Sequence, residues 1–315
     1  MTLSQLRAFV EVATAGSVRG AAARLLVSQP AVSAAVAALQ KDLGVALVNR
    51  EGRGLQLTPA GRVFADYARQ VLGLLEEARV AATGQLSPER GRVRLAVVTT
   101  VGEHVLPPFL AAFRSRCPAA EITLEVGNRN RVWELLRFRE VDLVIGGRPP
   151  AGGRFSTLAT RSNRLVVVAP RPSSAPEGPQ CREVAVAELA AHVWLVREPG
   201  SGTRATVEEL FEDLGIAPAT LTLGSNGAVR ESVRAGLGVT LIARDAVARE
   251  LDRGTVEEWR TPGLPLERTW HVVGRAGEDL PPTAALFLDG LATPGEVAGS
   301  EAFRRVASRS LSAGQ

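Results

Sequence analysis

The sequence of 315 residues has few of the residue types that form metal sites and disulfide-linked scaffolds. Its two cysteines, Cys117 and Cys181, form no Cys-x-x-Cys pair, so neither a disulfide framework nor a cysteine-ligated zinc site is expected. Its three histidines, His104, His192 and His271, are dispersed, and no pair of carboxylates or cysteines stands at ligand spacing to them. The sequence therefore predicts no bound metal and no cofactor.

Long apolar runs and the short motifs of common enzymes are also missing. No stretch approaches the ~20 apolar residues that span a bilayer, and the first residues, MTLSQLRAFVEV, lack the basic-then-apolar order of a signal peptide. A membrane partner is not expected, and the predicted location is the cytoplasm. The sequence contains no GxSxG elbow, no Walker loop and no HExxH helix, so no catalytic residues are predicted.

Acidic residues are scarce in only one part of the chain. Residues 1–62 contain seven basic side chains against three acidic ones, and the remaining residues contain 30 of each, so the whole formal net charge of +4 lies in the first fifth of the chain. A local basic excess is typical of a segment that binds a polyanion such as nucleic acid. From charge alone, a chance excess on a solvated face is the alternative.

Capping signals divide the first 44 residues into three helices. Thr2 followed by Gln5 fits a capping box, and apolar residues then recur at helical spacing until Gly16. Ser17 is placed to cap a second helix, and Ser28 is placed to cap a third after a tight turn. Two short helices joined by a tight turn predict a helix-turn-helix.

The third predicted helix runs from Gln29 to about Leu43. Pro30 lies in its first turn, where a missing amide proton matters little, and Gly44 is placed to end it. In a helix-turn-helix, hydroxyl and amide side chains at the start of this helix reach base edges and phosphates in the major groove. The alternative is that Ser28 and Gln29 only cap the helix, and capping and DNA contact can also hold together.

The stretch VALVNREGRGLQLT, which follows the third helix, predicts two short strands around a turn. Such a hairpin is the wing of a winged helix-turn-helix. Arg50 and Arg53 flank the turn and can reach phosphates or the minor groove, contacts that position a protein without reading sequence.

Thr58 followed by Pro59 marks the start of a long helix that continues for about 25 residues without a strong breaker. Its apolar residues step alternately by three and four positions, the seam spacing of a coiled coil, and they are Phe64, Tyr67, Val71, Leu74, Ala78 and Ala81. The seam predicts a dimer in which two reading helices address two half-sites of a palindrome. An ordinary packed helix is the alternative.

The polar segment GQLSPERGR, residues 84–92, marks the start of a region where β-branched runs alternate with helical stretches. The predicted strands are 93–98, 121–126, 141–147, 164–170, 193–196, 221–225, 239–243 and 269–274. The predicted helices are 103–116, 129–139, 204–214 and 227–236. This alternation predicts open, parallel-type α/β sheets, and the region is long enough for two of them.

Two stretches, LSQLRAFVEVATAGSVRGAAARLLVSQPAVSAAVAALQKDLGVALVNR and LTPAGRVFADYARQVL, resemble the N-terminal part of LysR-type transcriptional regulators. The similarity extends more loosely to about residue 300. It implies an α/β fold with an N-terminal winged helix-turn-helix, a linker helix and a two-lobed effector domain like a periplasmic binding protein. In such a domain the chain crosses between the lobes twice, and we expect the crossings near 161–164 and 265–268.

The resemblance also implies the division of the chain and its DNA-binding residues. The expected parts are a winged helix-turn-helix at 1–58, a linker helix for dimerisation at 59–87, an effector domain at 88–300 (lobe I 92–161 and 268–296, lobe II 165–265) and a disordered tail at 301–315. Many family members carry a basic or amide side chain where this chain has Ala34 and Ala35, so base reading is not carried over to these two positions. The predicted DNA-binding residues are Ser17, Arg19, Ser28, Gln29, Pro30, Ser33, Arg50 and Arg53.

Open α/β sheets bind ligands beyond the C-terminal ends of their strands, in the crevice between lobes. Two segments there, 99–102 and 201–204, combine helix-start amides with hydroxyl groups, and the second adds an arginine, so they favour a carboxylate, phosphate or sulfate. A capped helix without a ligand is the alternative for each. The predicted effector-binding residues, with those at two further strand ends, are Thr99, Thr100, Val101, Gly102, Ile145, Arg148, Ser201, Gly202, Thr203, Arg204 and Asn226. The GSGTR segment is typical of part of the family, including regulators of carbon fixation and sulfur metabolism.

The sequence thus predicts a transcription regulator that binds palindromic promoter DNA and responds to a small anionic metabolite. The expected partners are double-stranded DNA, the effector, further copies of the chain in a homodimer or homotetramer, and RNA polymerase. An enzyme using the cleft is the first alternative, but Glu103, Asp142 and Glu198 are interpreted as surface or capping carboxylates and not as catalytic groups. The second alternative is a constitutive DNA-binding protein whose C-terminal domain serves only oligomerisation.

Overall fold

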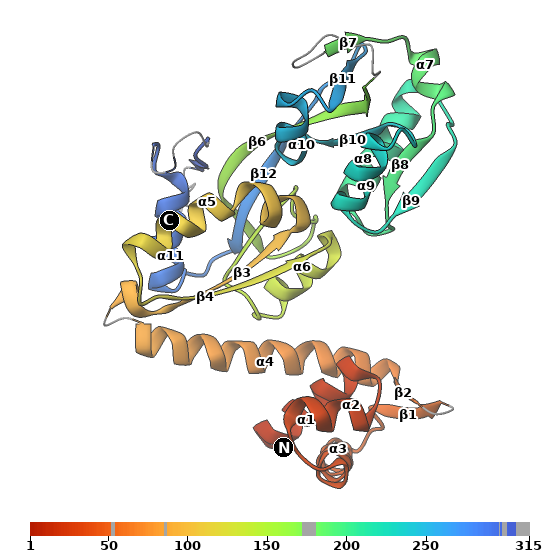
Figure 1. Cartoon of the computed structure of the whole chain (residues 1–315). Helices are drawn as coiled ribbons and strands as arrows, with labels where there is room; N and C mark the ends of the chain where they lie inside the picture. Colours follow the sequence, from red (N-terminus) through yellow and green to blue (C-terminus); the bar gives the residue numbers. More distant parts are fainter. Residues whose placement is uncertain (52–53, 85–86, 172–180, 296, 298–300, 307–315) are drawn as a thin grey trace, which may run out of the picture. The chain divides into compact units, whose positions relative to one another are not determined.

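The computed structural model describes residues 1–51, 54–84, 87–171, 181–295, 297 and 301–306. Arg53, one of the predicted DNA-binding residues, lies outside them. The chain forms two compact units, Met1–Thr83 with Arg137–Glu140 and Gly84–Leu136 with Val141–Gln315. Figure 1 shows that helices dominate the first unit, while helices and strands alternate in the second.

Three helices and a hairpin make up the first 57 residues. They are α1 (Leu3–Ala15), α2 (Val18–Leu25), α3 (Gln29–Leu43), β1 (Val48–Glu51) and β2 (Gly54–Leu57). The hydroxyl groups of Thr2, Ser17 and Ser28 each accept a hydrogen bond from an amide three residues on, so all three predicted caps are formed. Gly16 and Gly44 end α1 and α3 in the left-handed conformation that glycine adopts without strain. The predicted winged helix-turn-helix is confirmed.

A small apolar core fixes the angles between these helices. Phe9 of α1 and Leu39 of α3 are fully buried at its centre. The side-chain oxygen of Gln40 accepts hydrogen bonds from the amides of Leu47 at 2.8 Å and Val48 at 3.1 Å, which ties α3 to the hairpin. Because the apolar side of α3 is used for this core, its opposite side is left to solvent.

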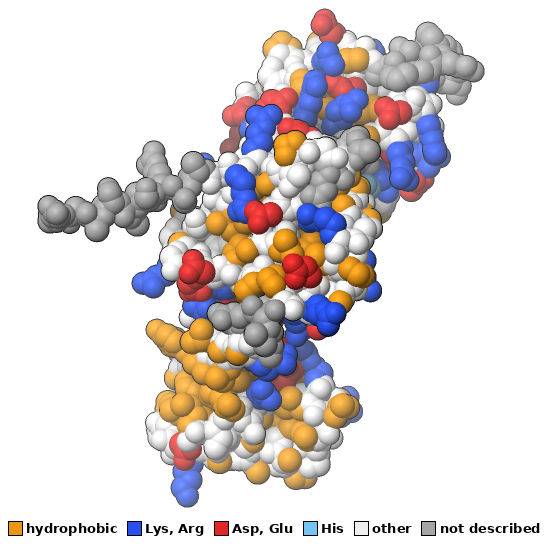
Figure 2. Space-filling model, turned by 90° about the vertical axis from the view of Figure 1, so that its left-hand side faces the viewer, with side chains coloured by type: hydrophobic (Ala, Val, Ile, Leu, Met, Phe, Trp, Pro, Cys, Tyr) orange, Lys and Arg blue, Asp and Glu red, His pale blue; other side chains and the backbone are white. Residues whose placement is uncertain are grey.

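A single long helix, α4 (Pro59–Gly84), completes the first unit. The prediction of a seam beginning at Phe64 is wrong, because the Phe64 ring packs against the core of the three helices instead. Tyr67, Val71 and Leu74 are 66%, 45% and 53% exposed and form an apolar row on the solvent side of α4. Figure 2 shows hydrophobic side chains gathered on one face of the first unit.

One part of the second unit is built around a parallel sheet, and we call this part lobe I. Its elements are η1 (Pro88–Arg90), β3 (Arg92–Val98), η2 (Val101–Val105), α5 (Pro107–Arg116), β4 (Glu121–Gly127), α6 (Arg129–Arg137), β5 (Leu143–Gly146) and α11 (Pro282–Ala292). β3 lies between β4 and β5 and is parallel to both. The helix predicted over 103–116 is interrupted, because η2 is a π-helical turn and Pro107, which lacks an amide proton, starts α5 afresh.

Two long antiparallel strands connect lobe I to lobe II. They are β6 (Phe155–Pro170) and β12 (Leu266–Arg275), and they pair along the whole of β12. β12 pairs with β5 in lobe I, whereas the last part of β6 pairs with β10 and β11 in lobe II. Strands of both lobes therefore belong to one hydrogen-bonded sheet. The predicted parallel pairing holds for β3, β4 and β5, whereas β6 and β12 are antiparallel. The expected crossings lie on β6 and at the start of β12.

Lobe II consists of the elements between these two strands. They are β7 (Cys181–Glu183), α7 (Val186–Ala191), β8 (Trp194–Arg197), α8 (Gly202–Leu214), β9 (Thr220–Leu223), α9 (Asn226–Arg234), β10 (Thr240–Ala243), α10 (Arg244–Asp252) and β11 (Val256–Arg260). β8 and β9 are parallel. The fully buried Trp194 ring meets the Phe211 ring edge to face, with 4.9 Å between centroids, and holds α8 against β8.

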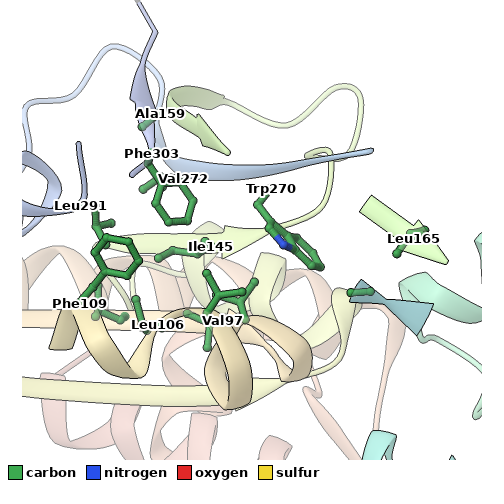
Figure 3. Close-up of a cluster of buried hydrophobic side chains, with 14 of the residues drawn as sticks. Val97, Leu106, Phe109, Ile145, Ala159, Leu165, Trp270, Val272, Leu291 and Phe303 are labelled. Atoms are coloured by element: carbon green, nitrogen blue, oxygen red, sulfur yellow. The ribbon is translucent and has the colours of Figure 1, made fainter. Parts of the chain in front are cut away.

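The chain returns to lobe I in a segment that was predicted to be a disordered tail. That prediction is wrong for 301–306, because Phe303 is only 1% exposed and its ring lies 5.9 Å from that of Phe109. The two rings lie together in the core of lobe I in Figure 3. β13 (Arg304–Arg305) then pairs with β6. Burying one phenylalanine stabilises a fold by ~1.5–3 kcal/mol, which suffices to order a short segment.

Among the described residues, no single helix is long and apolar enough to cross a membrane. Only when taken together do α2 and α3 have the length and apolar composition of a membrane span, and the two helices are bent by 109° relative to each other.

Candidate functional site

The solvent side of α3 presents the predicted reading surface. Ser28, Gln29, Pro30 and Ser33 are all exposed, and Ser28 also caps the helix by accepting from the amide of Ala31 at 3.4 Å. Capping and exposure therefore hold together at Ser28. A short helix with polar groups at its exposed N-terminus is the element that enters a major groove in winged helix-turn-helix proteins.

Three further predicted DNA-binding residues belong to the start of α2 and to the hairpin. Ser17 is half-buried, and its hydroxyl caps α2 by accepting from the amide of Gly20 at 3.1 Å. Arg19, the second residue of α2, is exposed. Arg50 belongs to the first strand of the hairpin. Ala34 is exposed beside Ser33, so the surface offers a methyl group at this position.

The second unit contains a cavity of about 560 Å³, which we call the cleft. This volume is in the range of small-molecule sites, ~300–1,000 Å³. Its walls come from the ends of β3 and β5, the start of α8, and the crossing strands β6 and β12. The predicted residues that line it are Thr99, Thr100, Arg148, Ser201, Gly202 and Thr203. Residues of both segments that the sequence singled out, 99–102 and 201–204, therefore line one cavity.

Five predicted effector-binding residues do not line the cleft. Val101 and Ile145 are fully buried in the apolar core, and Gly102 packs against the side chains of neighbouring strands. Asn226 is also buried, directly behind Thr100. These four lie next to cleft residues along the chain or in space, but their side chains do not face it.

Arg204, the fifth, points away from the cleft. Its guanidinium donates to the carboxylate of Glu208 at 2.8 Å, to the main-chain oxygen of Arg197 at 3.0 Å and to the Thr222 hydroxyl at 3.3 Å. The prediction that Arg204 binds the effector is therefore wrong as a direct contact. The reason is that one turn of α8 places this side chain on the face that packs against the ends of β8 and β9.

Arg197, which the sequence analysis did not select, lines the cleft instead. Its side chain is 9% exposed and donates to both carboxylate oxygens of Glu198, at 2.7 and 2.9 Å, and to the side-chain oxygen of Asn226. Burial raises the pKa of Glu198, but the hydrogen bonds from Arg197 and from a backbone amide outweigh it, so this pKa lies below its ordinary value. Glu198 is thus ionised and is a partner of Arg197, not a capping carboxylate.

Further cations line the cleft from other elements. Arg129 starts α6, Arg148 follows β5, and Arg268 lies on β12. His271 lies on β12 as well, and burial together with the neighbouring Arg148 lowers its pKa below 6.5, so the ring is neutral at pH 7. Glu209, which pairs with Arg268, and Glu267 also line the cleft. Four arginines against two glutamates leave an excess of positive charge in the lining, which favours an anion.

Two buried polar groups of the cleft wall have no hydrogen-bond partner within the described part of the chain. They are the side-chain oxygen of Asn163, on β6, and the indole nitrogen of Trp270, on β12. Their residues are only 5% and 7% exposed. An unpaired buried polar group costs about 1–3 kcal/mol, so such groups mark positions where a ligand or water supplies the missing partner.

Asp142, interpreted from the sequence as a surface or capping carboxylate, is neither. It is 1% exposed and accepts from the backbone amide of Arg94 at 2.8 Å and from its guanidinium at 2.6 Å. This pair joins β3 to the loop before β5. Asp142 is therefore a structural group of lobe I and not part of the cleft.

A winged helix-turn-helix followed by a long helix and a two-lobed domain with a polar cleft defines a ligand-responsive DNA-binding regulator. Family models agree with both parts. Residues 3–62 match the bacterial regulatory helix-turn-helix protein, lysR family, and residues 87–293 match the LysR substrate binding domain. The chain belongs to the LysR family of transcriptional regulators.

Individual relatives are similar over nearly the whole chain. The HTH-type transcriptional regulator CbbR of Xanthobacter flavus is 36% identical, covering 93% of this chain and 88% of its own length. The RuBisCO operon transcriptional regulator of Allochromatium vinosum is 34% identical, covering 91% and 94%. Among solved structures, the CcmR regulatory domain of Synechocystis PCC6803 in complex with 2-PG is 30% identical, with a TM-score of 0.56, covering 63% of this chain and 94% of that one.

Proposed function

We propose that this regulator controls genes of carbon fixation in response to a small anion that carries a phosphate or carboxylate and at least one hydroxyl group. The observation that carries this proposal is the cleft, where basic side chains of both lobes converge with the start of α8. Arg129 and Arg148 belong to lobe I, and Arg197 belongs to lobe II. An anion between them is attracted to both lobes at once.

The start of α8 supplies the second part of an anion site. The first amide groups of a helix have no partner inside it and carry a partial positive charge. The Ser201 hydroxyl makes no capping bond to α8, so both this hydroxyl and the amides of Gly202 and Thr203 are available to a ligand. These groups support binding of a carboxylate or phosphate at this end of the cleft.

The unpaired polar groups of Asn163 and Trp270 are the reason for proposing a hydroxyl group on the effector. The Asn163 oxygen only accepts hydrogen bonds, and a fully ionised anion has no proton to donate to it. A hydroxyl group on the ligand donates to Asn163, while any oxygen of the ligand accepts from the Trp270 indole.

The relatives support the regulated process and supply a first ligand to test. A RuBisCO operon regulator and the CcmR domain with bound 2-PG are both similar to this chain. We infer that a phosphorylated hydroxy acid related to 2-phosphoglycolate is bound here and is not turned over, because the carboxylates at or beside the cleft, such as Glu198 and Glu209, serve as partners of arginines. We propose that the protein acts in the cytoplasm, where promoter DNA is accessible to it.

At the DNA, we propose that Gln29, Pro30 and Ser33 read bases, while Ser17, Arg19, Ser28, Arg50 and Arg53 hold phosphates. Effector binding alters the angle between lobes I and II, and α4 transmits this change to paired reading helices in a dimer or tetramer. Altered spacing of the reading helices then changes DNA bending and access of RNA polymerase to the promoter.

Calorimetric titration of the full chain tests the effector. We compare 2-phosphoglycolate, 3-phosphoglycerate and sulfate, and we expect 3-phosphoglycerate to bind more tightly than 2-phosphoglycolate because it adds a hydroxyl group. Asn163→Leu should remove this preference. If no anion binds to the folded chain while it still binds its promoter DNA, the alternative of a constitutive DNA-binding protein is the correct one. If the two phosphorylated acids bind with equal affinity, the effector has no hydroxyl group that contacts the cleft, but the proposed anion site stands.

A further inference from the structure

A chain of buried hydrogen bonds crosses from lobe II to lobe I behind the cleft. Asn226, the first residue of α9, accepts a hydrogen bond from the guanidinium of Arg197 through its side-chain oxygen. Its side-chain nitrogen lies 3.0 Å from the hydroxyl oxygen of Thr100, at the end of β3 in lobe I. All three residues are more than nine-tenths buried, and Arg197 and Thr100 also line the cleft.

The chemistry of these groups sets the direction of every bond in the chain. A guanidinium can only donate, so the oxygen of the Asn226 amide must face Arg197. The nitrogen of the amide then faces Thr100 and donates to it, so the Thr100 oxygen is the acceptor. A hydroxyl group that accepts one bond still has its own proton to donate. Among the described residues, no hydrogen bond uses that proton.

We propose that Asn226 is a positioning residue that turns the O–H group of Thr100 into the cleft as a hydrogen-bond donor to the bound anion. Its own side chain does not touch the ligand. The proposal rests on the proposed function, because it assumes that the cleft binds an anion. It also assigns to Asn226 a role different from the direct contact expected from the sequence.

Arg197 keeps this arrangement in one orientation. Glu198 holds the guanidinium by two hydrogen bonds, and the first residue of α9 is fixed because the Ser225 hydroxyl caps the helix by accepting from the amide of Ala228 at 3.1 Å. A rotated amide would place its nitrogen against the arginine, donor against donor. The orientation of the Thr100 hydroxyl is therefore determined from the opposite lobe.

This arrangement also links anion binding to the closed position of the lobes. The bond between Asn226 and Thr100 joins the two lobes, so it exists only when they are close together. In an open form, Thr100 would lose its fixed donor direction. Anion binding and lobe closure then favour each other, because each stabilises the same orientation of one hydroxyl group.

The variant Asn226→Asp tests the direction of the chain. Aspartate has nearly the shape of asparagine and still accepts from Arg197, but it presents a second acceptor to Thr100. The Thr100 hydroxyl must then donate to Asp and no longer to the anion. The added negative charge also weakens anion binding by itself, so the same variant is made on a Thr100→Val background, where the charge effect remains and no hydroxyl is present.

The four proteins of this cycle, each as the full chain, are titrated with 2-phosphoglycolate and with sulfate, and their melting temperatures without ligand establish that they fold. We expect N226D to weaken binding about tenfold more in the wild-type background than in T100V, the size of one hydrogen bond to a charged group. T100S, which retains the hydroxyl, should respond to N226D like the wild type. Equal factors in both backgrounds would overturn the proposal. If the wild type binds neither of these anions nor 3-phosphoglycerate, the proposed function itself fails, and the proposal fails with it.

Discussion

The guanidinium of Arg204 donates to the main-chain oxygen of Arg197 at 3.0 Å. The two arginines have different roles. Arg204 ties α8 to the end of β8, whereas the side chain of Arg197 lines the cleft. The arginine that the GSGTR motif displays is therefore structural. The one that faces the ligand site, Arg197, comes three residues before the motif.

Replacing Arg204 should affect stability and not ligand binding. Arg204→Ala removes three hydrogen bonds of a partly exposed side chain, and we expect a loss of about 1–2 kcal/mol in the free energy of unfolding with anion affinity changed less than about twofold. Arg148→Ala, the matched variant, should leave stability unchanged and weaken anion binding about tenfold. Thermal unfolding and calorimetric titration of both variants separate the two roles, and the reverse pattern would show that the assignment is wrong.

Asp142→Ala should be strongly destabilising, because it leaves the Arg94 guanidinium buried without its carboxylate. The two side chains are 6% and 1% exposed, and removing one partner of a buried pair costs about 3–5 kcal/mol. Urea unfolding of the effector domain within the full chain measures the loss. Glu231→Ala, which breaks the exposed pair with Arg234, serves as the control and should change stability by less than about 1 kcal/mol. Similar losses in the two variants would argue against this view of Asp142.

Anion affinity should rise as the pH falls from 8 to 6. The pKa of His271 lies below 6.5 in the ligand-free protein because of burial and Arg148, so the ring is neutral there. A bound anion favours the charged ring and raises this pKa, so binding takes up a proton near neutral pH. Sulfate stays fully ionised over this pH range, so titrations with sulfate in buffers of different ionisation enthalpy measure the proton uptake of the protein, and it should be absent in His271→Gln.

The same histidine makes stability depend on pH in the opposite sense. Because its folded pKa is depressed, its contribution to stability is fully present above the unfolded value near 6.5 and is lost as the pH falls through the folded pKa. Wild-type melting temperatures should therefore decrease below pH 6.5 more steeply than those of His271→Gln. Parallel pH profiles would falsify this assignment. His104, whose pKa is also lowered, contributes equally to both proteins and cancels in the comparison.

Gln29→Ala should reduce sequence discrimination more than general DNA affinity. An amide side chain on the exposed start of α3 can read a base edge, a contact worth ~1–3 kcal/mol of discrimination. Arg50→Ala, in contrast, should weaken binding to specific and unrelated DNA alike and reduce the slope of log affinity against log salt by about one. Gel-shift titrations at several salt concentrations distinguish the two. A uniform loss for Gln29→Ala would place this residue on the phosphates.

Leu74→Glu should weaken self-association. Leu74 is 53% exposed in the apolar row of α4, and a charge in a helix–helix seam opposes burial. Leu237→Glu, at an equally exposed leucine of lobe II, is the matched control. Sedimentation velocity at several protein concentrations should show a lower association constant for the first variant only. Unchanged association of Leu74→Glu would mean that copies meet elsewhere.

Local signals in the sequence predicted the first unit in detail, because its elements are set by capping. Ser17, Ser28, Gly16 and Gly44 each act within one turn of their own helix, so their roles follow from the nearest neighbours. The seam was misplaced at Phe64 since periodicity alone does not tell which side of a helix meets the core.

The sequence predicted part of the lining of the cleft and missed other side chains. Strand ends and helix starts gave segments 99–102 and 201–204, and residues of both line the cleft in the structure. Arg197, Asn163 and Trp270 lie within or at the end of strands, where polar and aromatic residues usually have structural roles, so no local pattern marked them. Their importance depends on contacts between residues far apart in the sequence, such as Asn226 with Thr100.

The segment 301–306 lacks a recognisable strand or helix pattern, yet it sets a practical limit for work with the isolated effector domain. A fragment cut at residue 300 would expose the aromatic face of Phe109 and an unpaired edge of β6, the two features that cause recombinant fragments to aggregate. Extending the fragment by six residues covers both with its own chain. Affinity tags and fluorescent reporters should be attached after residue 306, so that Phe303 stays packed on Phe109 and β13 stays paired with β6.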